Sequence, residues 1–115
     1  MAAFASRLQL APVAIPQMLT ACEFVLGEPR EIILTGRRES AQMRALLAEL
    51  HHRFVPSRVV LLVDSPEARH ALAVGIPSIE SMNPPEAGAT AHVCRNYTCQ
   101  LPVSEPAEFA ELIQY

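Results

Sequence analysis

Lysine and tryptophan are both absent from this chain of 115 residues, and charged residues make up only 18% of it. Soluble domains commonly carry about 25% charged residues, so the deficit predicts that part of the surface meets protein rather than water. All positive charge comes from arginines that are scattered along the chain, and the net charge is −3. We expect no nucleic-acid partner, because such a surface needs concentrated positive charge.

Long apolar runs and a cysteine framework are missing as well. No stretch approaches the roughly 20 apolar residues that cross a bilayer, so we expect no membrane partner. The 3 cysteines are too few for a small fold stapled by disulfides, which predicts a soluble protein of a reducing compartment, the cytoplasm. The length suits one domain with a single core.

What is present is an alternation of helix-like and strand-like segments. A short helix with one buried face is predicted from Pro16, with Gly27 as its left-handed stop. Helical spacing of apolar residues, or proline at a first helical position, predicts three further helices. Continuous β-rich apolar runs predict strands, the first two covered on both faces, and a short return strand follows them. These helices are expected near 39–54, 66–74 and 106–113, and these strands at 31–36, 58–64, 90–94 and 100–103.

The alternation predicts an α/β fold, a small three-layer α/β/α sandwich with a mostly parallel sheet of three to four strands. Strands that are joined through helices run parallel by right-handed crossovers. We expect the core strands at 32–34, 59–63 and 91–93, all parallel. The proline-rich region 75–89, with Pro84 and Pro85, is predicted as a loop or short helical turn.

Cys94 and Cys99 are the residues around which any chemistry has to be sought. Their C-x4-C spacing differs from the C-x-x-C of a thioredoxin-type active site. Three interpretations stay open: two reduced structural cysteines, a structural disulfide across a tight turn at 95–98, and a redox-active pair. The first is favoured, because Arg95 is the only local residue that would lower a thiol pKa.

A zinc site is a weaker interpretation of the same segment. His92 and Cys94 are two residues apart and share one face of a strand, so with Cys99 they would supply three ligands. A fourth ligand is missing, and closed zinc sites normally use two ligand pairs. We predict no metal and no cofactor.

A second candidate site lies where the first two strands end. Gly36, Arg37 and Arg38 follow the first strand, and Asp64 follows the second. Ligands of open parallel sheets bind at the carboxyl ends of strands, and arginines beside a helix N-terminus can hold an anion. The turn has no G-x-G-x-x-G or phosphate-loop pattern, so a tight turn with solvated arginines is favoured.

The chain contains, in this order, the segments AFASRLQLAPVAIPQML, REIILTG, FVPSRVVLLVD and ATAHVCRNYTCQLPVSEP. Together they resemble the C-terminal segment of the spermatogenesis-associated, thioredoxin-domain-containing protein family. Its members are similar to three-part proteins: a thioredoxin-like domain, a helical barrel like those of six-hairpin glycosidases and sugar epimerases, and this tail. The resemblance implies that residues 1–12 connect from the barrel and that 13–115 form a single α/β domain. It carries over no catalytic residue of the other two parts.

The residue patterns and the resemblance together predict a non-catalytic accessory domain. Its expected partners are the helical barrel and the thioredoxin-like domain of its parent chain. We expect residues 4–19, with part of 75–89, to present an apolar patch to the barrel. The isolated chain should then order this segment poorly or self-associate weakly. The alternative is a small thiol-redox or anion-binding module that uses Cys94, Cys99 and the Arg37–Arg38 strand end. The sequence holds no complete active site.

Overall fold

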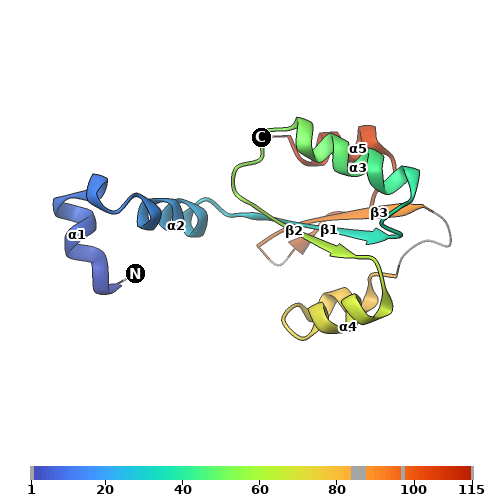
Figure 1. The fold of residues 1–115 in the computed structure, drawn as a ribbon, viewed down its shortest axis with the longest axis horizontal. Helices are drawn as coiled ribbons and strands as arrows, with labels where there is room; N and C mark the ends of the chain where they lie inside the picture. The colour runs from blue at the N-terminus through green and yellow to red at the C-terminus, as the bar shows by residue number, and fades with distance from the viewer. Residues whose placement is uncertain (1, 84–87, 97, 115) are drawn as a thin grey trace.

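The computed structural model describes residues 2–83, 88–96 and 98–114. Within these ranges, α3 (Ala41–His52) and α5 (Pro106–Leu112) cover one face of a four-stranded sheet. The other face carries α4 (Pro66–Ala73) and the 3-10 turn η3 (Pro77–Ser81), as Figure 1 shows. The predicted α/β/α sandwich is confirmed. Pro84, Pro85 and Tyr97, which the sequence placed in a loop and a turn, lie outside the described residues.

The sheet has the strand order β2-β1-β3-β4. Its strands are β1 (Arg30–Gly36), β2 (Arg58–Val63), β3 (Ala89–Arg95) and β4 (Thr98–Cys99). β1 and β2 run parallel and are joined through α3, as predicted. β3 runs antiparallel to β1, which corrects the expectation of an all-parallel core and a mostly parallel sheet.

The path of the chain after β2 explains the direction of β3. A single helix would carry the chain back across the sheet to the start of β1, as a parallel strand requires. Here α4 is followed by η3, which packs against it and turns the chain around. β3 therefore begins at the same end of the sheet at which β2 stops. Thr35 of β1 pairs with Val63, near the end of β2, and the adjacent Gly36 pairs with Ala89, at the start of β3. The return segment 100–103 likewise pairs antiparallel, through Val103 and Ala91.

The two faces of the sheet have separate apolar clusters. The α3/α5 face is the larger, and Phe109, Leu46 and Ile113 are fully buried in it. The α4 face is smaller and includes Ile33, Ile79, Met82 and Cys94. Ile79 and Met82 of the proline-rich region thus pack into the core, and the expectation that another part of 75–89 joins an apolar patch stays a prediction.

Serine caps fix the starts of the two helices that follow β1 and β2. Ser40 Oγ accepts a hydrogen bond from the Met43 N–H, and Ser65 Oγ accepts one from the Ala68 N–H, both at 3.1 Å. Each satisfies an N–H group that has no partner within the helix. Pro66 follows Ser65 at the first helical position, as the sequence predicts.

β2 is less covered than the sequence suggests. It lies at an edge of the sheet, and Val59 and Val60 are 37% and 38% exposed, so the prediction of a fully buried strand is wrong. Phe54, which was expected to continue the buried face of the second helix, lies beyond the end of α3 and is exposed. Of the two strands predicted to be covered on both faces, β1, which has a neighbour on each side, is the one that is buried.

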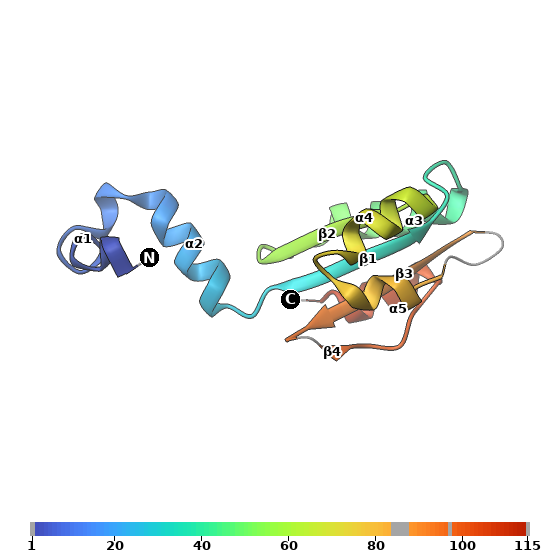
Figure 2. The same ribbon diagram turned by 90° about the horizontal axis from the view of Figure 1, so that it is seen from below.

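Residues 2–26 form an arm of four short helical segments that extends away from the sheet (Figures 1 and 2). They are η1 (Ala2–Phe4), α1 (Ala5–Leu10), η2 (Pro12–Ala14) and α2 (Pro16–Leu26). The radius of gyration is 16.6 Å, against about 13 Å for a compact domain of this length. Neither α1 nor α2 has a buried residue, so the expected buried face of the Pro16 helix is absent.

The arm meets the sandwich at a left-handed residue. The sequence points to Gly27 for this role, but Gly27 has a φ of −85°. Glu28, the next residue, has a φ of 53° instead. A non-glycine residue pays a steric cost in this region, so the direction of the arm depends on one constrained residue just before β1.

Candidate functional site

Cys94 and Cys99 form a disulfide across the β3–β4 hairpin. The two residues stand directly opposite each other, and Arg95 pairs with Thr98 next to them. Asn96, in the turn, has a φ of 51°, a conformation that asparagine tolerates well. The favoured prediction of two reduced cysteines therefore differs from the structure, because the hairpin register sets both side chains face to face. Cys94 is 3% exposed in the core, whereas Cys99 is exposed to solvent.

His92 points to the same face as Cys94 but joins no ligand cluster. In the described part of the chain, no group of three or more His, Cys, Asp or Glu residues is placed to hold a metal ion. The His92 Nε2 atom is buried and has no hydrogen-bond partner. Its burial lowers the pKa of His92, because the charged imidazolium loses hydration there.

The carboxyl ends of β1 and β2 meet as predicted, and they bring Arg38 to Asp64. The Arg38 guanidinium contacts Asp64 Oδ2 through Nε at 3.0 Å and Nη2 at 2.9 Å. Asp64 therefore offsets the charge of Arg38 and leaves the exposed Arg37 as the other cation of this turn. Gly36 has a φ of 139°, and a Cβ there would lie 2.5 Å from the Gly88 carbonyl oxygen. A role of these four residues in anion binding stays a prediction.

The opposite end of the sheet carries three arginines that the sequence did not bring together. Arg30 of β1 pairs in register with Arg58 of β2 on one side and with Arg95 of β3 on the other. Registered neighbours share a face, and this is the face of α3 and α5, since Ile32 and Val93 alternate with them into that cluster. We call these three residues the arginine row. These three arginines lie far apart along the chain, and the fold brings them to adjacent strands.

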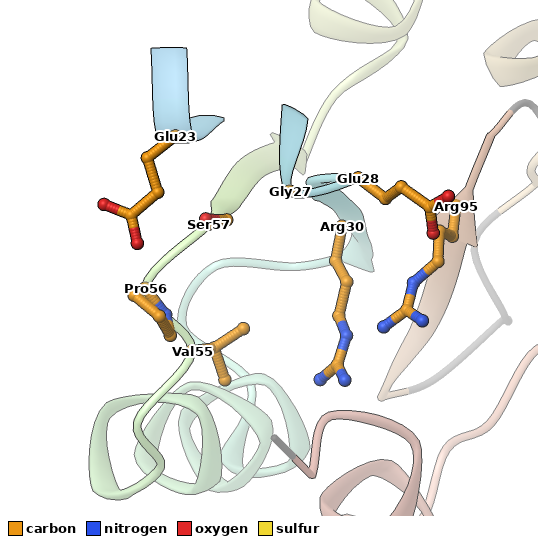
Figure 3. Close-up of a pocket in the computed structure, with 8 residues that line it drawn as sticks. All are labelled: Glu23, Gly27, Glu28, Arg30, Val55, Pro56, Ser57 and Arg95. Carbon is orange, nitrogen blue, oxygen red and sulfur yellow. The ribbon is translucent and has the colours of Figure 1, made fainter. Parts of the chain in front are cut away.

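Arg30 and Arg95 of the arginine row line a pocket of about 120 Å³, drawn in Figure 3. It is lined by Glu23, Gly27, Glu28, Arg30, Val55, Pro56, Ser57 and Arg95. A second pocket of about 270 Å³ shares Arg30 and Arg95 with it and extends toward Leu112. The Arg30 Nη2 atom donates a hydrogen bond to the Gln114 carbonyl oxygen, just beyond α5. The Arg30 Nη1 atom is buried and has no partner.

The arm supplies a third candidate surface, of apolar character. Its most exposed large side chains are Leu10, Val13 and Leu26, at 86%, 87% and 81% exposure. Phe4, Leu19 and Val25 are also exposed. Single exposed apolar residues are normal, but a whole segment without burial marks a contact surface. Within residues 4–19, Phe4, Leu10, Val13 and Leu19 are exposed, whereas Leu8, Ile15 and Met18 are partly buried. Contact of this segment with a barrel stays a prediction.

Comparisons with known proteins relate this chain to one region of a much longer spermatogenesis-associated protein. The human protein named spermatogenesis-associated protein 20 is 30% identical to it over 111 residues. The rat and mouse proteins of the same name are 27% and 28% identical over the same length. The matched region covers 96% of this chain but 14% of each relative. The chain is homologous to the C-terminal region of these proteins.

Other comparisons add no further relative. No family model matches the chain, and no solved structure matches it. None of the helices in the described part of the chain is both long and apolar enough to cross a membrane.

Proposed function

We propose that this chain is a non-catalytic accessory domain of a larger protein that also contains a thioredoxin-like domain and a helical barrel. Its arm docks on the barrel, and the sandwich lies beside it. The observation that carries the proposal is the arm itself: helices α1 and α2 bury none of their residues in this chain. The homology to a small C-terminal part of longer proteins supports it.

The energetics of the arm favour such docking. Burying a side chain such as Leu10 or Leu26 contributes about 1.5–3 kcal/mol relative to leaving it in water. Isolated helices as short as α1, at 6 residues, are marginal in water, because nucleation is costly. The arm should therefore gain most of its order from the surface that covers it, whereas the sandwich has its own core.

Hydrogen exchange on the isolated chain and on the full-length parent protein tests the proposal. Amides of α2 should exchange quickly in the isolated chain and slowly in the parent, while those of β1 stay protected in both. Leu10→Asp with Val13→Asp in the parent should abolish the difference. Gln9→Asp, an equally exposed position in α1, serves as the matched control. Equal protection of α2 in both proteins would refute docking.

A second candidate function is a thiol-redox module, and the hairpin disulfide favours it. Cys99 is exposed, so an external thiolate can attack its sulfur. The S–S bond then breaks, Cys94 leaves as a thiolate, and a mixed disulfide with Cys99 forms. When the attacking thiolate belongs to a dithiol, its second thiol attacks the mixed disulfide and releases Cys99. The dithiol is then oxidised to a disulfide, and the hairpin cysteines are both reduced. A cytoplasmic location, which we also propose, would keep such a pair largely reduced.

Alkylation rates of the reduced chain as a function of pH distinguish the two functions. An accessory domain should have ordinary thiols, which form thiolate near pH 8.5, about the free-cysteine value. A thiolate that forms below about pH 6.5 at either position would favour the redox module.

A further inference from the structure

The arginine row places three like charges next to one another on a half-buried surface. Adjacent strands are about 4.8 Å apart, and like charges directly opposite each other destabilise a sheet. Arginine cannot relieve this repulsion by losing its proton in proteins. The strain acts on Arg30 above all, because burial and the neighbouring Arg95 both lower its pKa.

The described part of the chain does not neutralise the row. Its ion pairs join Arg38 to Asp64, Arg53 to Glu49 and His70 to Glu80, and none includes Arg30, Arg58 or Arg95.

Two carboxylates do line the pocket beside the row. Figure 3 shows the Arg30 and Arg95 side chains extending in the same direction, so that their guanidinium groups end next to each other. The Glu28 carboxylate lies at the backbone end of Arg95, away from both guanidinium groups, and Glu23 points to the other side. Neither glutamate occupies the space between the cations.

We propose that the arginine row binds an oxyanion with two negative charges, of the phosphate class. The buried Nη1 of Arg30 supplies a donor with no partner in the protein, and Arg95 supplies a second guanidinium from the adjacent strand. Arg58 is the register neighbour of Arg30 on β2, but it lines neither of the two pockets that Arg30 and Arg95 share. Planar guanidinium groups match the oxygens of phosphate in bidentate pairs. A monocarboxylate would offset only one of the two positive charges in the pocket, so a dianion is preferred.

Titration of the purified chain with inorganic phosphate tests the site. Binding is measured by calorimetry and by the rise in melting temperature, with chloride added to keep the ionic strength constant. Arg95→Gln removes one exposed donor and should weaken phosphate binding by about tenfold or more, the value of one charge-assisted hydrogen bond. Arg7→Gln, an exposed arginine of the arm that belongs to neither candidate anion site, is the matched control and should bind as the wild type does.

A second readout separates binding from general salt effects. Without phosphate, Arg95→Gln should melt above the wild type, because a like-charge neighbour of Arg30 is gone, and with phosphate the order should reverse. Equal phosphate responses of the wild type, Arg95→Gln and Arg7→Gln would overturn the proposal, as would acetate binding as tightly as phosphate.

Comparison of two phosphate ligands identifies the source of the group. Tighter binding of glycerol phosphate than of inorganic phosphate supports a phosphate monoester as the occupant. Tighter binding of inorganic phosphate supports the free ion.

Discussion

The sandwich and the arm are both rich in apolar residues, yet they use them in opposite ways. The sandwich buries Ile32, Leu46 and Phe109 completely between β1, α3 and α5. The arm has helices of its own but leaves Leu10 and Val13 in water. The difference teaches that apolar composition and helical spacing can predict a helix with apolar side chains. Whether those side chains are buried depends on a second surface that packs against the helix. For the sandwich that surface is in the same chain.

The largest effect should come from the core of the sandwich. Phe109→Ala removes a fully buried ring and should lower the free energy of unfolding by about 3–5 kcal/mol. Should this variant fail to fold, Ile33→Val on the other face offers a milder change of about 0.5–1.5 kcal/mol. Urea unfolding followed by circular dichroism measures both. A loss below 0.5 kcal/mol for Phe109→Ala would mean that the α3/α5 face is not the main core.

The hairpin disulfide should give the next largest effect. Its two cysteines are 5 residues apart, and closing a loop this short stabilises the folded state by about 2 kcal/mol in the chain-entropy view. Cys99→Ser should lose that amount in non-reducing buffer. Reduction of the wild type should cost the same. Wild-type stability that is independent of reductant would contradict a formed disulfide.

His92 should give the sandwich a pH dependence that the arm lacks. Its pKa in the folded state lies below the ordinary value of 6.5, so the unfolded chain binds the proton more readily. Stability is then complete above about pH 6.5 and falls as the pH drops below it. His92→Gln should remove this fall in the unfolding free energy below pH 6.5. His51→Gln, exposed at the end of α3, should keep the slope, and loss of the slope in that control would exclude His92 as its source.

The arm should give the smallest effect of all. Leu10→Ser and Val13→Ser change side chains that are almost fully exposed, so the unfolding free energy of the isolated chain should move by less than about 0.5 kcal/mol. Chemical denaturation of the same set of variants provides the measurement. A loss comparable to that of a core substitution would erase the distinction between arm and sandwich.

Much of the sandwich could be predicted from the sequence, because its local signals agree with its packing. The apolar run of β1, the spacing of Met43, Leu46 and Leu50 in α3, and the Ser65-Pro66 start of α4 each have a direct structural counterpart. The exposure of β2 could not be predicted in this way, since a run of apolar residues does not reveal whether a strand has one neighbour or two.

The sequence predicts the wrong direction for β3, and for that reason it also fails to predict the arginine row. A parallel β3 would end beside Gly36 and Asp64, and Arg95 would lie there with Arg37 and Arg38. The antiparallel strand moves Arg95 to the opposite end, next to Arg30. Strand direction depends on how α4 and η3 turn the chain, and no local propensity in 66–81 encodes that path. The arginine row thus becomes visible only once the topology is known.

The open edge of β2 gives the absence of lysine a second meaning. Edge strands expose unpaired backbone groups that template further strands, and proteins commonly guard them with lysine or proline. The sequence of β2, RVVLLV, has neither, and its single charge stands at its first residue. We expect concentrated solutions of the isolated chain to grow edge to edge into fibrils that raise thioflavin T fluorescence. In a longer protein, another part of the chain that covers β2 would prevent this edge-to-edge association.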